Sequence, residues 1–200
     1  MTALALRERR FPVTFALILY GSMAVAAMIW IHFAGVLSFT AMVVKPPVAG
    51  PLAIGVGTGL FLAATVAGLT VTFPTFRDLE TEFAQIFADQ RGFEALALAL
   101  LSGIGEELFF RGAMQQALAM KLGTTAGILA TSLVFALFHV PFTRRLFTWP
   151  AMAFVAGVVL GYLLHWTGSL VAPIAAHVVV NAVGIWRIAR RYGTPKPETE

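Results

Sequence analysis

The sequence lacks cysteine and has few charged residues. None of its 200 residues is cysteine, which excludes disulfides, thiolate nucleophiles and cysteine-ligated zinc. Only 12% of the residues are charged, against about 25% in a typical soluble domain, and 58% are hydrophobic. This composition is typical of a protein that crosses a membrane several times. The net charge of +4 does not indicate a nucleic-acid partner, because the basic residues lie in loops and at the ends and no nucleic-acid-binding motif is present.

Six apolar stretches approach the length of about 20 residues that a membrane-spanning helix needs. They cover residues 12–36, 50–73, 93–119, 124–140, 149–166 and 170–189. We therefore predict an all-α fold, a polytopic transmembrane helix bundle of about six spans in an integral membrane protein. The first stretch is too long for a signal-peptide core and lacks a convincing cleavage site, so we expect it to remain as a span.

The distribution of lysine and arginine predicts the orientation of these spans. With six spans and a cytoplasmic N-terminus, 11 of the 14 basic residues fall on the cytoplasmic side. They are Arg7, Arg9, Arg10, Arg77, Arg91, Arg144, Arg145, Arg187, Arg190, Arg191 and Lys196. The opposite side holds only Lys45 and Lys121, and Arg111 lies within a span. This asymmetry predicts that both termini are cytoplasmic.

We divide the chain into three parts of a single membrane domain. Residues 1–92 hold two spans and a segment from Pro74 onward in which charged residues alternate with apolar residues at helical spacing. That segment is expected to be an amphipathic helix on the membrane surface or a cap of the bundle. Residues 93–189 hold four spans, and residues 190–200 form a polar tail.

Two spans carry glycines four residues apart. Gly55-xxx-Gly59 lies in the second span, and Gly157-xxx-Gly161 lies in the fifth. Small residues at this spacing let the backbones of two membrane helices approach closely. Both patterns therefore predict tight helix packing.

The sequence Glu106-Glu107-xxx-Arg111 lies inside the third apolar stretch. A charged side chain in hydrocarbon costs about 2.5–3.5 kcal/mol on insertion scales, so such residues usually face an interior and serve a function. Glu107 and Arg111 share a helix face, which predicts a buried ion pair. Glu106 is rotated by about 100° and is free to face a cavity, where it could act as a general base. Alternatively, all three residues form one charge network that locks the bundle.

Later spans supply partners for Glu106. His139 ends the fourth span in the pattern Phe135-xxx-His139, and His177 and Asn181 share one face of the sixth span. Glu106 and His139 could hold and deprotonate a water molecule. His177 and Asn181 could then donate hydrogen bonds to an oxyanion, worth about 3–4 kcal/mol for one donor in a soluble protease. Alternatively, the two histidines and a glutamate could bind zinc, although no HExxH motif is present.

The predicted spans place Glu106 and His139 at different depths. Glu106 lies about 13 residues, or roughly 20 Å, from the inner end of the third span, since a helix rises about 1.5 Å per residue. His139 lies close to the inner end of the fourth span. For the two to meet, either residues 93–98 lie partly outside the membrane or a water-filled cavity opens inward. The sequence leaves both possibilities open.

The ordered set of motifs resembles the CAAX protease and bacteriocin-processing (CPBP, or Abi) family, the group of the prenyl-protein endopeptidases. The motifs are EExxxR at 106–111, FxxxH at 135–139 and HxxxN at 177–181. The stretch from Phe154 to Gly161 and the run from Thr167 to His177 are also similar to members of this family. The resemblance covers roughly residues 93–185, the catalytic core of the family, and so implies that the four spans of residues 93–189 form such a core.

This resemblance implies a glutamate-dependent, metal-independent intramembrane endopeptidase. In the family pattern, the residues that match Glu106 and His139 activate water. Those that match His177 and Asn181 form the oxyanion site. Glu107 and Arg111 match the supporting pair, in agreement with the helical-face argument. No cofactor is expected, and zinc is the less favoured alternative.

The expected partners are the lipid bilayer and a membrane-protein or lipidated peptide substrate, with no nucleic acid. The compact size resembles that of bacterial members, so we expect the protein in the bacterial inner (cell) membrane. Residues 1–92 match no motif of the family, so prenylation of the substrate is not assumed.

Two other classes of function remain open. One is a non-catalytic bacteriocin-immunity or membrane scaffold protein of the same fold. The four intact reacting positions favour the enzyme over this alternative. The other is a transporter or proton relay, because membrane glutamates and histidines also serve those roles. The sequence shows no obvious inverted repeat of the kind that transporters contain.

Overall fold

The computed structural model describes residues 10–33, 47–90, 92–139 and 148–194. All regular elements in these ranges are helical, and no strand occurs in them. In chain order they are α1 (Val13–Phe33), α3 (Ala49–Thr72), α4 (Pro74–Phe87), α5 (Gly92–Glu107), η1 (Leu108–Met114), α6 (Gln115–Leu122), α7 (Thr124–Phe138), α8 (Thr148–Thr167) and α9 (Val171–Tyr192). Helices α1, α3, α8 and α9 are long and apolar enough to cross a membrane. The predicted all-α membrane fold is confirmed.

The helices follow the six predicted stretches. The third stretch is the continuous series α5, η1 and α6, and the fourth is α7, a shorter apolar helix. The first three residues of the predicted polar tail, 190–192, continue α9. The count of six spans and the orientation stay predictions. Seven of the basic residues used for the orientation lie outside the described ranges: Arg7, Arg9, Lys45, Arg91, Arg144, Arg145 and Lys196.

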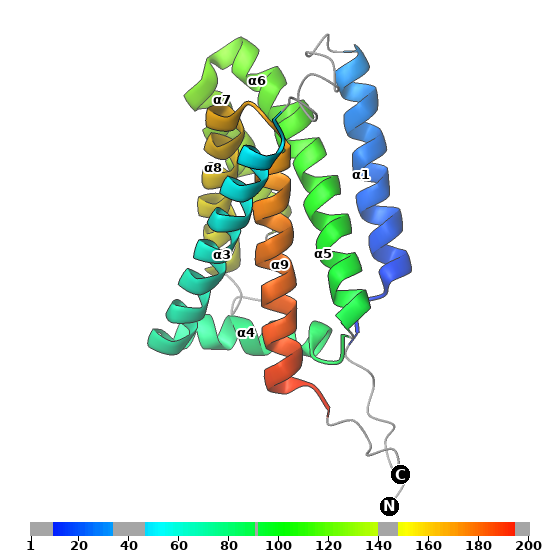
Figure 1. The fold of residues 1–200 in the computed structure, drawn as a ribbon, viewed down its shortest axis with the longest axis vertical. Coiled ribbons are helices and arrows are strands. Elements are labelled where there is room, and N and C mark those ends of the chain that lie inside the picture. The colour runs from blue at the N-terminus through cyan, green and yellow to red at the C-terminus, as the bar shows by residue number, and fades with distance from the viewer. Residues whose placement is uncertain (1–9, 34–46, 91, 140–147, 195–200) are drawn as a thin grey trace, which may run out of the picture.

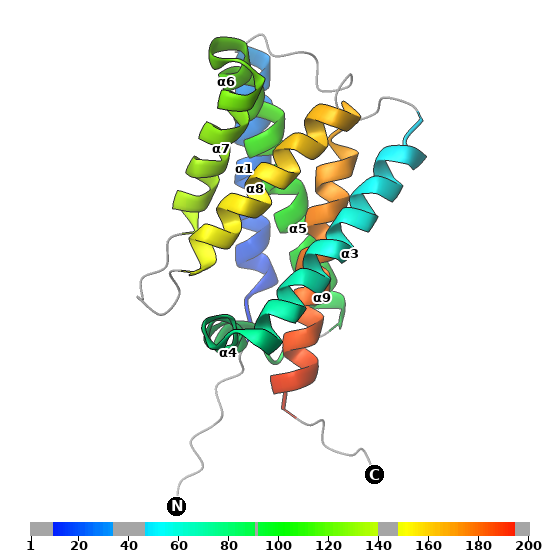
Figure 2. The ribbon, with the colours of Figure 1, turned by 90° about the vertical axis from the view of Figure 1, so that its left-hand side faces the viewer.

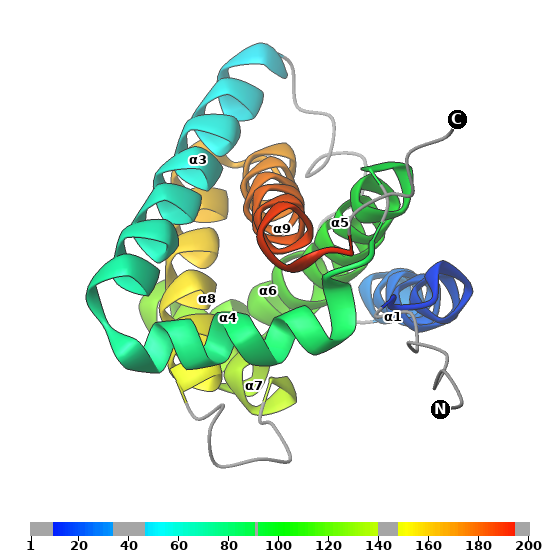
Figure 3. The ribbon, with the colours of Figure 1, turned by 90° about the horizontal axis from the view of Figure 1, so that it is seen from below.

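Helix α9 occupies the centre of the bundle. It packs between α3 and α5, and α1 packs on the far side of α5 (Figures 1 and 3). Helices α6 and α7 form a hairpin whose turn is Gly123, at φ +84°, a backbone conformation that glycine adopts without strain. Helix α7 packs in turn against α8, which contacts α9. Helices from both ends of the chain therefore surround α5 and α9.

Glycines on α3 allow it to approach α9 closely. A Cβ atom added at Gly59 would stand 2.6 Å from the carbonyl oxygen of Ala176, and one at Gly55 would collide with the carbonyl oxygen of Ala172. Only a residue without a side chain fits at either position. The tight packing predicted from Gly55-xxx-Gly59 is confirmed, and its partner is α9.

The second glycine pair has the same role on α8. A Cβ atom added at Gly157 would lie 3.0 Å from the Cβ atom of Ser132 on α7. One added at Gly161 would lie 2.8 Å from Cγ2 of Ile128 on the same helix. This predicted tight packing is also confirmed, and it holds α8 against α7.

The predicted amphipathic helix is α4, which lies across the lower end of the bundle (Figures 2 and 3). Pro74 opens it, since its fixed φ suits the first turn of a helix and its missing N–H has no partner there. Glu80 on its buried face accepts hydrogen bonds from Arg187 and Arg191 of α9, each at 3.2 Å. Helix α4 therefore caps the bundle through ion pairs to α9.

The outward faces of the bundle are apolar. Large exposed side chains include Ile18 on α1, Phe61 and Val71 on α3, Leu137 on α7 and Trp166 on α8. Extended exposed apolar surfaces of this kind are rare on soluble monomers and mark contact with lipid or protein. Together with the four helices of spanning length, they identify an integral membrane protein.

The glycine packing gives a stability prediction with a control on the same helix. We expect Gly59→Ala to lower the free energy of unfolding by about 1–3 kcal/mol, the usual cost of overpacking a tight contact. Gly57→Ala is expected to be neutral or stabilising, because nothing lies within 4 Å of an added Cβ atom. Inside a helix, glycine is also less stable than alanine by about 0.5–1 kcal/mol. The melting temperatures of the wild type and the two variants are measured by thermal unfolding in the same detergent. Equal melting temperatures for the two variants would contradict this packing.

Candidate active site

The structure brings the six predicted site residues together from three parts of the chain. Glu106 and Glu107 end α5, Arg111 lies in η1, His139 follows α7 directly, and His177 and Asn181 lie on α9. Four of them line one cavity: Glu106, His139, His177 and Asn181. Glu107 and Arg111 lie behind them, each with a fully buried side chain. The predicted separation of the two glutamates onto different faces is therefore confirmed.

A short π-helix, η1, begins directly after the two glutamates. Its wider turn is seen where the backbone N–H of Gln115 donates to the carbonyl oxygen of Phe110, five residues earlier. Such segments occur frequently at functional sites. The sequence predicts one span over residues 93–119 and gives no sign of η1, because none of its local patterns distinguishes a π-turn from an α-turn.

The predicted ion pair between Glu107 and Arg111 is present. Nη1 of Arg111 lies 3.1 Å from Oε1 of Glu107. Nη2 of Arg111 donates to the carbonyl oxygen of Gly157 at 3.2 Å, and the guanidinium lies 4.5 Å from the ring centre of Phe135. Arg111 thus ties η1 to α8 and α7, and it supplies a fixed positive charge beside Glu107.

His177 shares the Glu107 carboxylate with Arg111. Its Nδ1 atom lies 2.8 Å from Oε1 of Glu107. Because an ionised carboxylate only accepts hydrogen bonds, Nδ1 is the donor. The other ring nitrogen, Nε2, lies 3.9 Å from Oε2 of Glu106. Glu107 therefore orients His177 toward Glu106, a contact that the sequence analysis did not predict.

His139, like His177, directs its Nε2 atom toward Oε2 of Glu106. Its Nδ1 lies 2.7 Å from the carbonyl oxygen of Phe135, which accepts the hydrogen bond. Its Nε2 lies 3.9 Å from Oε2 of Glu106. That oxygen is buried and has no hydrogen-bond partner among the described residues. Two imidazoles from different helices thus converge on one carboxylate oxygen.

The position at which α7 ends explains how His139 reaches Glu106. Helix α7 has only 15 residues and ends partway along the bundle, above the level of α4 (Figure 2). His139, which caps its C-terminal end, therefore lies beside the last turn of α5 rather than beside its start. The two explanations given for the difference in depth, residues 93–98 partly outside the membrane or a water-filled cavity that opens inward, stay predictions.

Asn181 is held by a residue that the sequence analysis missed. Its Nδ2 donates to Oγ of Ser102 at 2.9 Å. Ser102 lies one turn before Glu106 on α5, and both line the cavity. Gly103 brings the helices together, since an added Cβ atom there would lie 2.6 Å from Cγ2 of Val178 on α9. The only sequence signal was the spacing of four residues between Ser102 and Glu106.

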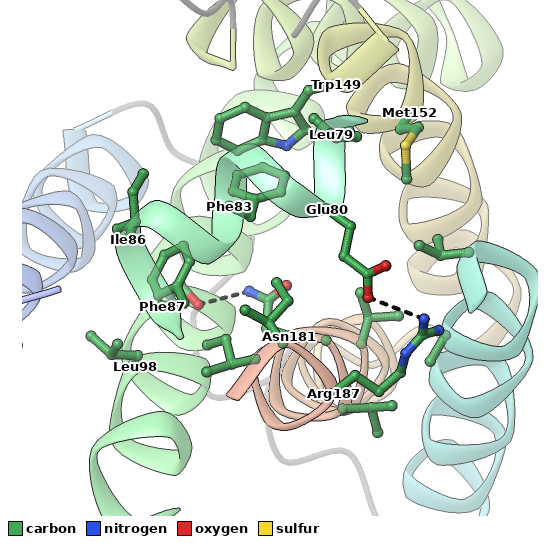
Figure 4. Close-up of a pocket in the computed structure, with 18 of the residues that line it drawn as sticks. Leu79, Glu80, Phe83, Ile86, Phe87, Leu98, Trp149, Met152, Asn181 and Arg187 are labelled. Atoms are coloured by element: carbon green, nitrogen blue, oxygen red, sulfur yellow. Dashed lines mark hydrogen bonds and ion pairs between the residues drawn. The ribbon is translucent and has the colours of Figure 1, made fainter. Parts of the chain in front are cut away.

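The cavity has a volume of about 400 Å³ and is apolar over most of its surface. Phe83, Ile86 and Phe87 of α4 form one side, with Leu98 of α5 nearby (Figure 4). The ion pair between Glu80 and Arg187 also borders it. Binding sites in proteins usually have this form, with a few polar side chains beside extensive apolar walls.

The alternative zinc set consists of His139, His177 and a glutamate. In the part of the chain that the structure describes, no group of three or more acidic, histidine or cysteine side chains has the arrangement of a metal site. Glu106 and the two histidines meet through contacts of 3.9 Å. The choice between a bound water and a bound metal remains a prediction for experiment.

Comparison with known proteins matches the segment that holds this cluster. Residues 90–183 match the family model of type II CAAX prenyl endopeptidases, Rce1-like. The uncharacterized protein YpbD of Bacillus subtilis (strain 168) is 33% identical over 101 residues, which are 50% of this chain and 48% of YpbD. The match thus spans about half the length of this curated relative, and no solved structure matches the chain. The matched residues 90–183, which contain all six predicted site residues, are thus similar to the Rce1-like type II CAAX prenyl endopeptidases.

Proposed function

We propose that the protein is an intramembrane endopeptidase of the glutamate type. The observation that carries this proposal is the convergence of His139 and His177 on Oε2 of Glu106, each at 3.9 Å, at the edge of an apolar cavity. The name of the matching family supports cleavage of peptide bonds. The proposal assigns the chemistry to the four polar residues that line the cavity.

Glu106 and His139 bind and activate the attacking water. A separation of 3.9 Å is too long for a direct hydrogen bond, but it suits a water about 2.8 Å from each acceptor. Because Nδ1 of His139 donates to Phe135, Nε2 of the neutral ring carries a lone pair that accepts one water hydrogen. Oε2 of Glu106 accepts the other.

The proton then follows the bond changes. Glu106 takes a proton from the water while the water oxygen bonds to the scissile carbonyl carbon. This step forms a tetrahedral oxyanion. When the carbon–nitrogen bond breaks, Glu106 returns this proton to the leaving amine. One carboxylate therefore serves as base and then as acid, and water is the only co-reactant.

His177 and Asn181 stabilise the oxyanion. Nδ1 of His177 already donates to Glu107, so Nε2 can also donate only when the ring is an imidazolium. The charge balance favours that form, because two carboxylates and the guanidinium of Arg111 leave one negative charge in the cluster. Asn181 uses one amide hydrogen for Ser102 and keeps the second for the substrate. Each such donor is worth about 3–4 kcal/mol in the transition state.

The substrate is a membrane-associated protein or a lipidated peptide. The apolar walls of the cavity favour an apolar segment next to the scissile bond. The likeness to a Bacillus protein supports a location in the bacterial cell membrane. Glu107 and Arg111 support the site from behind, and the mechanism uses no cofactor.

The proposal predicts that Glu106→Gln abolishes proteolysis without unfolding the protein. Loss of a general base lowers the rate by about 10²–10⁴-fold. Membranes from cells that express the wild type or the variant are compared by proteomics for new peptide termini near membrane segments. Termini that require Glu106 identify substrates as well as activity. The control is Glu94→Gln, at the start of the same helix and outside the cavity lining.

Equal termini in cells carrying the wild type and Glu106→Gln, with both proteins folded at matched levels, would contradict the endopeptidase. That result would support the non-catalytic immunity or scaffold protein instead.

A second prediction concerns metals. Cleavage of a Glu106-dependent substrate is expected to be unchanged after incubation with EDTA or 1,10-phenanthroline, because water activation is assigned to Glu106 and His139 alone. The initial rate is measured before and after chelation. A loss of activity that zinc restores would contradict this mechanism. It would support a zinc ion bound by His139, His177 and a glutamate.

A further inference from the structure

Tyr20 on α1 lies at the cavity, although it belongs to none of the motifs and precedes the segment 90–183 that matches the family. Its side chain lines the same cavity as Glu106, His139 and His177. It also interacts with the carboxylate of Glu106. A tyrosine in an apolar helix needs a partner for its hydroxyl group, and a carboxylate is a strong acceptor.

The backbone places Tyr20 at this point. Helix α1 runs beside α5 (Figures 1 and 3). A Cβ atom added at Gly105 would lie 2.5 Å from the carbonyl oxygen of Tyr20 and 2.8 Å from its Cβ atom. Gly105 immediately precedes Glu106, so the absence of a side chain at Gly105 brings Tyr20 next to the carboxylate.

Glu106 needs such a contact. Its Oε2 faces two imidazole nitrogens at 3.9 Å and has no hydrogen-bond partner among the described residues. None of the hydrogen bonds described for the other site residues fixes the Glu106 side chain itself. A carboxylate that must hold water between two rings requires a defined orientation, and even a displacement of about 1 Å can cost 10²-fold in rate.

We propose that Tyr20 is a positioning residue for Glu106: its hydroxyl group donates a hydrogen bond to the carboxylate and holds Oε2 toward His139 and His177. This inference rests on the proposed function. It means that the N-terminal helix completes a site whose motifs all lie in residues 90–183. The active unit therefore includes α1.

The test is Tyr20→Phe in the full chain, reconstituted in liposomes. The probe is a synthetic, internally quenched peptide that carries the cleavage site of a Glu106-dependent substrate. We expect kcat to fall by about 10-fold or more, as for loss of a hydrogen bond to a charged group, with KM within about twofold. The melting temperature should stay close to that of the wild type. Tyr162→Phe, on α8 and outside the cavity lining, is the matched control and should keep wild-type kinetics.

A double-mutant cycle separates positioning from packing. Glu106→Asp withdraws the carboxylate by one methylene, so adding Tyr20→Phe to it should change kcat by much less than in the wild type. Wild-type kcat in Tyr20→Phe, or equal losses in both backgrounds, would overturn the role of Tyr20 while Glu106 dependence stands. Cleavage that persisted in Glu106→Gln would overturn the proposed function, and the role of Tyr20 with it.

Discussion

The site depends on one buried carboxylate, that of Glu107, which Arg111 and His177 share. Burying a charged group costs several kcal/mol even after relaxation, and only close, well-oriented partners offset that cost. Arg111 provides one at 3.1 Å and His177 another at 2.8 Å. Arg111 is itself held by the carbonyl oxygen of Gly157 and the ring of Phe135. This carboxylate therefore fixes η1, α7, α8 and α9 relative to one another.

Close helix packing positions the remaining groups. Without a hydrophobic driving force between helices in lipid, close contact and hydrogen bonds determine how they associate. Gly55 and Gly59 bring α3 onto α9, and Gly103 brings α9 onto α5. Gly105 brings α1 onto α5 beside Glu106. Gly103 and Gly105 thus set the distances between helices that carry polar residues of the site, and Gly55 and Gly59 hold α3 against one of these helices.

The sequence contains enough to predict the candidate site residues, but not everything that holds them together. Residues four apart share a helix face, so the pair of Glu107 with Arg111 and the cavity-facing position of Glu106 were predictable. The π-helix leaves no such periodic signal. Ser102 and Tyr20 are single polar residues in apolar helices, and their partners depend on helix contacts that periodicity does not define. The depth of His139 depended on where α7 ends within the bundle.

In the proposed mechanism, Glu107 holds His177 as an imidazolium whose Nε2–H faces Glu106. Solid-state nitrogen NMR of the protein with labelled histidine, in bilayers at neutral pH, tests it most directly. The chain has four histidines, and His177→Gln identifies the signal of interest. We expect two protonated ring nitrogens in His177 of the wild type and loss of the Nε2 proton in Glu107→Gln. A neutral His177 ring in the wild type would contradict it.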